Sequence, residues 1–246
     1  RRGVVAGWGY AGENRLGVDW GPCTGWAGFN LEAALPEDVM LELRVEAARN
    51  GIRVGSFTDN ILNLYEEVDK RASIAGQRWL IEHIGVYSKD EIARIKDLGL
   101  VLQAYSNRWL YQDGEQLRRD LGASEVDRIL PMRDLVDAGI HVSLATDNVP
   151  PTLFHPIWHV VSRKTEETGE RLGDAQALSR TEALACASRE GAWLSFEEDV
   201  KGTLEAGKYA DLAILSDDLL TMAEDDILDI TSVLTMTGGR VVHEAD

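Results

Sequence analysis

The sequence places a carboxylate and an imidazole next to each other, and a second carboxylate far along the chain. Glu82 and His83 lie near the end of the apolar segment 79–84, and Asp147 follows the apolar segment 140–145. Imidazole nitrogen and carboxylate oxygen are ligands that zinc, iron and manganese accept. The pattern suggests a metal site, although a strand-end histidine can instead bond a backbone carbonyl and an Asp-Asn-x-Pro run can simply form a turn.

Other side chains could contact a metal or a substrate. His155 and His159 lie four residues apart on a predicted helix and share a face, as ligand pairs do, but the HExxH pattern is absent and a polar helix start is the alternative. Arg163 could hold an anionic substrate group or pair with a carboxylate. Trp109 belongs to the long segment 105–130, which could be a lid, a pocket wall or a surface loop.

The composition is that of a folded globular chain. Its 246 residues are 44% hydrophobic and 27% charged, and 25 basic against 42 acidic residues give a net charge of −17, so we expect no nucleic-acid partner. Neither a run of the roughly 18 to 20 apolar residues that span a membrane nor a signal-peptide stretch is evident, so we expect a cytoplasmic protein without membrane contact. Cys23 and Cys186 lack CxxC spacing and are predicted to be ordinary buried thiols.

Helices and strands alternate through the middle of the chain. The predicted strands are at 52–56, 79–84, 100–104 and 140–145, and the predicted helices are at 36–50, from 58, at 88–99 and at 131–138. These strands are too apolar to have a solvent-exposed face, which predicts a parallel sheet covered by helices. In such a sheet reactive side chains collect at the carboxyl ends of the strands.

The two ends of the chain differ from this middle part. Residues 1–35 are rich in glycine and tryptophan without a period and are predicted to be irregular. Beyond a helix from about Pro156 and a capping box that begins at Ser179, residues 210–215, 232–237 and 240–243 predict a small antiparallel element with a Gly238-Gly239 hairpin turn. We therefore expect one domain over 1–200 and a second over 201–246. The glycine-rich phosphate-binding motifs and the GxSxG motif are absent.

Several motifs occur in a characteristic order: Ile81-Glu82-His83, Gly139-Ile140-His141-Val142, Thr146-Asp147-Asn148, and a glycine-lysine-x-alanine-aspartate-leucine run over 207–212. Together they resemble the metal-dependent amidohydrolase superfamily, and within it the branch that contains N-substituted formamide deformylases. The resemblance extends from about Pro36 to the C-terminus.

The resemblance implies an α/β fold that is the C-terminal half of a (β/α)8 TIM-type barrel plus strands of a small β-sandwich. It implies that His83 and Asp147 bind a divalent metal, zinc first, with iron or manganese as alternatives. Metal-bound hydroxide would attack an amide or formamide-like small molecule at a non-peptide carbon–nitrogen bond, with Asp147 as the catalytic proton acceptor and donor. We expect the substrate to contact Glu82, Asn148, Arg163 and Trp109.

The sequence also departs from the family pattern. Only the strands that resemble strands five to eight can be counted, and Gly55 or Ser56 stands where strand five carries histidine in the family. One histidine and one aspartate are fewer than the three protein ligands of a catalytic zinc site. We therefore expect a homo-oligomer or a complementing N-terminal segment to supply the rest. The alternative is a catalytically inactive subunit or fragment that supports another chain.

Overall fold

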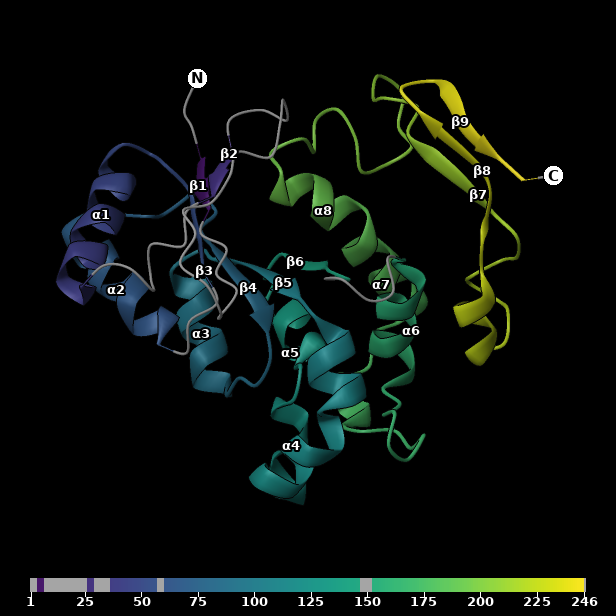
Figure 1. Cartoon of the computed structure of the whole chain (residues 1–246), viewed down its shortest axis with the longest axis horizontal. Coiled ribbons are helices and arrows are strands. Elements are labelled where there is room, and N and C mark those ends of the chain that lie inside the picture. Colours follow the sequence, from purple (N-terminus) through teal and green to yellow (C-terminus); the bar gives the residue numbers. More distant parts are fainter. Residues whose placement is uncertain (1–3, 7–25, 29–35, 57–59, 147–151, 246) are drawn as a thin grey trace. The chain divides into compact units, whose positions relative to one another are not determined.

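The computed structural model describes residues 4–6, 26–28, 36–56, 60–146 and 152–245, coloured in Figure 1. The chain divides into two compact units. The N-terminal unit comprises Arg1–Glu82 and Asp90–Leu102, and the C-terminal unit comprises His83–Lys89 and Gln103–Asp246. Strands β4 and β5 each begin in the first unit and end in the second.

The N-terminal unit is an α/β structure. Its elements are β1 (Val4–Ala6), β2 (Trp26–Gly28), α1 (Glu37–Arg49), β3 (Val54–Ser56), α2 (Ile61–Arg71), most of β4 (Leu80–Ile84), α3 (Lys89–Asp97) and the start of β5 (Val101–Ala104). Strand β1 pairs in parallel with β2 and β3, and β3 pairs in parallel with β4. Within this unit the strands lie in the order β2-β1-β3-β4-β5. The α/β class predicted from the alternating pattern is confirmed.

Two of these strands lie where the sequence predicts irregular structure. Val4–Ala6 and Trp26–Gly28 pair with each other residue for residue, Val4 with Trp26 and Ala6 with Gly28. Each segment has only three residues, and their glycine-rich surroundings show no period of two. Pairing between segments some 20 residues apart depends on non-local contacts, which a local pattern does not contain.

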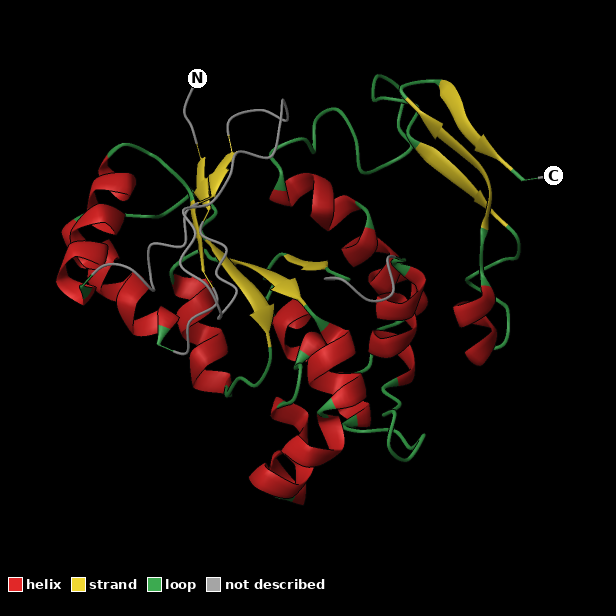
Figure 2. Cartoon of the chain, viewed as in Figure 1, coloured by secondary structure: helices red, strands yellow, loops and turns green. Residues whose placement is uncertain are grey.

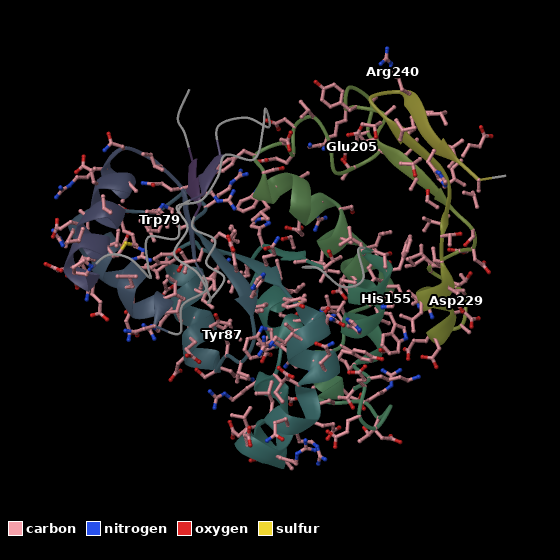
Figure 3. All side chains as sticks on the ribbon, viewed as in Figure 1. Trp79, Tyr87, His155, Glu205, Asp229 and Arg240 are labelled. Carbon is pink, nitrogen blue, oxygen red and sulfur yellow. The ribbon has the colours of Figure 1, made fainter. Side chains whose placement is uncertain are left out.

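The core of the N-terminal unit forms around two aromatic rings. Trp79, labelled in Figure 3, and Tyr65 of α2 are fully buried and meet edge to face, with ring centroids 5.0 Å apart. The hydroxyl of Tyr65 donates to the carbonyl of Leu80 at 3.1 Å, so the one polar atom of this ring is satisfied. These contacts hold α2 against the start of β4.

The C-terminal unit contains most of the helices (Figure 2). Its helical elements are a π-helix η1 (Asn107–Gln112), α4 (Gly114–Leu121), η2 (Ala123–Arg128), α5 (Met132–Asp137), α6 (Phe154–Ser162), η3 (Asp174–Gln176), α7 (Arg180–Ala187), α8 (Arg189–Leu194) and η4 (Asp225–Asp229). Its strands are the ends of β4 and β5, then β6 (Val142–Leu144), β7 (Leu212–Leu215), β8 (Ser232–Thr237) and β9 (Arg240–Glu244). The long segment 105–130 is thus mostly helical.

The predicted antiparallel tail is confirmed. Strands β7, β8 and β9 form a separate antiparallel sheet in that order, side by side in Figure 2. Gly238 and Gly239 join β8 to β9 with φ values of 56° and 78°, and positive φ at both central residues is what a type I′ hairpin turn requires. The domain boundary predicted after residue 200 stays a prediction.

Two further expectations concern cysteine and membranes. Cys186 is a free, buried thiol as expected, and burial raises its pKa to about 12. Cys23 lies outside the described residues. Among the helices that the structure describes, each is too short or too polar to cross a bilayer.

Helix α7 begins with the predicted capping box. The backbone N–H of Glu182 donates to the Ser179 hydroxyl at 3.3 Å, and the Glu182 carboxylate accepts the backbone N–H of Ser179 at 2.8 Å. Arg133 of α5 holds the same carboxylate in a bidentate pair at 2.7 and 2.6 Å. Ser179 therefore caps the helix start, and Glu182 connects that start to Arg133 of α5.

We expect Ser179→Ala to lower the free energy of unfolding by about 1 kcal/mol, because the substitution leaves a helix-terminal N–H without its side-chain acceptor. Urea denaturation followed by circular dichroism measures the change. Ser124→Ala is the matched control, since Ser124 lies in the helical element η2, is likewise exposed and makes no side-chain hydrogen bond within the described residues. Equal losses in the two variants would contradict the assigned role.

Candidate functional site

His83 lies one residue before the end of β4 with its backbone in a left-handed conformation. Its φ is 54°, and its side chain is half-buried between the buried residues Glu82 and Ile84. The imidazole ring lies beside that of Tyr105, which follows β5, with the ring planes tilted by 47° and the centroids 5.2 Å apart. Positive φ costs a non-glycine residue free energy, and such strained residues cluster at functional sites. The predicted ligand thus has a locally unfavourable backbone that its surroundings must stabilise.

Trp109 contacts the backbone that carries His83. Its indole N–H donates to the carbonyl of His83 at 2.9 Å. The indole also lies so close to Gly85 that a Cβ there would be 2.8 Å from its Cδ2 atom. The segment 105–130, for which a lid, a pocket wall and a surface loop were all open, therefore brings Trp109 to the end of β4. The sequence analysis did not identify Gly85, because a single glycine after a strand does not show which side chain will pack against its backbone.

Glu82 belongs to the N-terminal unit and lies next to β3. It is buried, and a Cβ added at Gly55 would be 2.7 Å from its Oε1 atom. A side chain at position 55 would therefore require the Glu82 carboxylate to move. Arg53 is also buried; desolvation and then repulsion from Arg78 lower its pKa to about 10, against the attraction of Glu82.

Asp147 and Asn148 lie outside the described residues. The last described residues before them are Ala145 and Thr146, and the backbone N–H of Ala145 bonds the carbonyl of Ala104 at 2.9 Å. The distance from Asp147 to His83 is therefore untested. The roles expected for Asp147 and Asn148 stay predictions.

His155 and His159 share one face of α6, as their spacing predicts, but they are placed differently. His155, labelled in Figure 3, is half-buried, and His159 is buried with its Nδ1 atom 3.2 Å from the hydroxyl of Ser106. The two rings meet edge to face with centroids 6.3 Å apart, and the ring of Tyr111 stacks on His159 at 4.8 Å. Ser106, which directly follows Tyr105 after a buried strand, is a partner that the sequence analysis did not identify.

Burial lowers the pKa of His159 to about 3, and the adjacent charge of His155 acts in the same direction. Burial also lowers the pKa of His155. His159 is therefore neutral at neutral pH and serves as a hydrogen-bonded core residue of α6. Among the residues that the structure describes, no group of three histidine, cysteine, aspartate or glutamate side chains could hold a metal.

Arg163 ends α6 and is fully buried. Its Nε, Nη1 and Nη2 atoms donate to the carbonyls of Leu172, Leu130 and Ile129 at 2.9, 2.8 and 2.8 Å. Burial lowers its pKa to about 10, which still leaves the guanidinium charged at neutral pH. The sequence suggests a substrate anion or a carboxylate as its partner, whereas in the structure backbone carbonyls accept hydrogen bonds from all three nitrogens. These bonds give Arg163 a structural role, and the substrate contact expected for it stays a prediction.

The remaining histidines have structural surroundings. His141 stacks on Trp193 with centroids 3.6 Å apart, and its Nδ1 atom is 2.6 Å from Glu190 Oε2. His243 is exposed on β9, with Nε2 3.1 Å from the Ser232 carbonyl. Both placements agree with the expectation that these two residues are structural or exposed.

Comparison with known proteins identifies the family. The model of the amidohydrolase family matches residues 24–243, most of the chain. The chain belongs to the amidohydrolase family. This finding confirms the resemblance that the ordered motifs indicate, and the match begins before Pro36, where those motifs place its start.

A curated relative lies in the expected branch of this family. An N-substituted formamide deformylase of Arthrobacter pascens is 28% identical over 222 residues, an alignment that covers 82% of this chain and 39% of the relative. The amidohydrolase chain thus spans about two fifths of that protein's length.

Solved structures share the fold of this amidohydrolase chain. An uncharacterized metal-dependent hydrolase of Pyrococcus horikoshii has a TM-score of 0.62 at 21% identity, covering 78% of this chain and 39% of its own. An adenosine deaminase of Xanthomonas campestris with bound zinc has a TM-score of 0.61 at 15% identity, with 92% and 54% covered. An atrazine chlorohydrolase of Arthrobacter aurescens in complex with zinc has a TM-score of 0.59 at 18% identity, with 92% and 52% covered.

The neutral His159 predicts a pH dependence of stability. In the unfolded chain His159 takes up a proton near its ordinary pKa of 6.5, whereas in the folded chain its pKa is about 3. The free energy of unfolding therefore falls as the pH drops below 6.5. Between pH 7 and pH 5 we expect wild type to lose about 1 to 2 kcal/mol more than His159→Gln, measured by urea denaturation. His243→Gln, at an exposed position, should lose as much free energy of unfolding between pH 7 and pH 5 as wild type does. If His159→Gln also loses as much as wild type, the assignment of a neutral, buried His159 is refuted.

Proposed function

We propose that this amidohydrolase chain contributes to the active site of a metal-dependent hydrolase that cleaves non-peptide carbon–nitrogen bonds in an amide or formamide-like small molecule. Family membership supports the reaction class, and the formamide deformylase relative supports the substrate class. The observation that carries the proposal for this chain is the strained His83 at the end of β4. Such a backbone persists only where neighbouring contacts hold it.

The fold proposed for the whole assembly is a (β/α)8 barrel with a small β-sandwich. In this proposal β3, β4, β5 and β6 are strands five to eight of the barrel, and β7–β9 are sandwich strands. The parallel pairing of β3 with β4 and the antiparallel tail support it, as do the structural relatives that this chain covers only in part. A complementing N-terminal segment or a second copy of the chain would supply the other strands.

The proposed metal site requires ligands beyond the described residues. His83 fits in type, because zinc accepts imidazole nitrogen, but a catalytic zinc ion takes about three protein ligands. We assign His83 and Asp147 as two of them, with zinc first and iron or manganese as alternatives. When bound, such an ion lowers the pKa of a water molecule toward 7 and polarises a substrate carbonyl.

The side chains of this chain would handle the proton and orient the substrate. Asp147 would accept a proton from the attacking water and return it to the leaving amine, so that the amine departs neutral. Glu82 and Asn148 are proposed substrate contacts, and Trp109 lies beside His83, where it would border the same site. The partner is a small molecule, and we place the protein in the cytoplasm, without nucleic-acid or membrane partners.

Two substitutions in the protein that carries this chain test the proposal. We expect His83→Asn to lower the bound zinc measured by elemental analysis, because it removes a ligand. Asp147→Asn should reduce turnover of N-formyl and N-acyl amines about a hundredfold or more, because it removes the proton acceptor. His243→Asn, on an exposed strand, should match wild type in both assays. Wild-type protein without bound metal or metal-restorable turnover would refute the proposed function.

A further inference from the structure

The left-handed backbone of His83 requires a contact that stabilises it. A φ of 54° is unfavourable for a residue other than glycine, and His83 lies within a strand between buried residues. Something outside β4 must therefore make this conformation the favourable one.

Trp109 supplies such a contact at two points. Its indole N–H donates to the His83 carbonyl at 2.9 Å, in a direction that depends on the His83 backbone angles. Two residues on, Gly85 leaves room for the indole ring, since a Cβ there would be 2.8 Å from Cδ2 and 3.0 Å from Cε2. The indole thus contacts the backbone on both sides of the buried Ile84.

The helix that carries Trp109 is itself unusual. Trp109 belongs to the π-helix Asn107–Gln112, whose neighbouring residues Asn107 and Leu110 are buried and anchor it. π-helical turns are rare and often occur at functional sites, because the extra residue in the turn re-aims side chains. Arg108 places its guanidinium 5.6 Å from the Trp109 ring centroid. Trp109 is therefore held in place from its own helix.

The ring of His83 has a second neighbour on the same segment. Tyr105 is buried, two residues before η1, and its ring centroid is 5.2 Å from that of His83. One segment following β5 thus contacts both the backbone and the ring of this histidine. A metal ligand must be held in a narrow range of directions by such surroundings.

We propose that Trp109 is a positioning residue: its indole N–H bond to the His83 carbonyl holds the left-handed backbone that aims the His83 imidazole. The inference rests on the proposed function, in which that imidazole binds the metal. It replaces the substrate contact of Trp109 as the main role of this side chain.

The test uses Trp109→Phe, which keeps an aromatic ring against Gly85 and removes the N–H donor. Trp158→Phe is the matched control, because it also removes an indole donor, from a bond to Asp225 at 3.1 Å, without contacting His83. The first measurement is the ¹H–¹³C NMR signal of the His83 ring in metal-free protein. We expect this signal to move in Trp109→Phe and to stay in place in Trp158→Phe.

The second measurement is zinc affinity by competition with a chelator. We expect Trp109→Phe to bind zinc about tenfold to a hundredfold more weakly than wild type, and Trp158→Phe to bind it as wild type does. Gly85→Ala, which displaces the indole, should reproduce the loss. An unchanged His83 signal in Trp109→Phe, or an unchanged zinc affinity where wild type binds zinc, would overturn the inference.

The two measurements separate this inference from the proposed function. Zinc binding that His83→Asn weakens and Trp109→Phe leaves unchanged would overturn the inference and preserve the function. Absence of zinc binding in wild type would overturn the function, and the metal-free His83 signal would then still decide whether Trp109 positions the ring.

Discussion

A buried cation holds together the part of the C-terminal unit on which the candidate site depends. The guanidinium of Arg163 binds the carbonyls of Ile129 and Leu130, and the N–H of Leu130 then bonds the Gly85 carbonyl at 2.7 Å. A charge can remain buried only when hydrogen-bond acceptors compensate the lost water, and here three backbone carbonyls do so. Gly85, two residues after His83, is thereby connected through Leu130 to the buried guanidinium of Arg163.

The other side of the same segment is fixed by an aromatic contact. Trp109 reaches the backbone of His83 and packs on Gly85, so two elements distant in sequence meet at the end of one short strand. Parallel strands require long crossover connections, and in this chain the connection after β5 is a run of helices rather than an open loop. The connection therefore both completes the fold and orders the candidate metal ligand.

Local patterns predicted most of the regular structure. The helix that starts after Pro36, the capping box at Ser179 and the hairpin glycines Gly238 and Gly239 depend on residues close together in sequence, and all three agree with the structure. The strands β1 and β2 were missed, because each is three residues long and is defined by its partner. The family was also recognisable from local patterns, because each of its motifs is short and the motifs follow one another in a fixed order along the chain.

The sequence by itself determined the α/β class, the caps and turns, the position of His83 near the end of a buried strand, and the family. The tertiary structure alone decided that Arg163 binds carbonyls, that His159 is a neutral core residue bonded to Ser106, and that Trp109 contacts the His83 backbone. The physical reason is the range of the interactions. Caps and turns form between neighbours, whereas burial and the choice of hydrogen-bond partner depend on segments that meet only when the chain has folded.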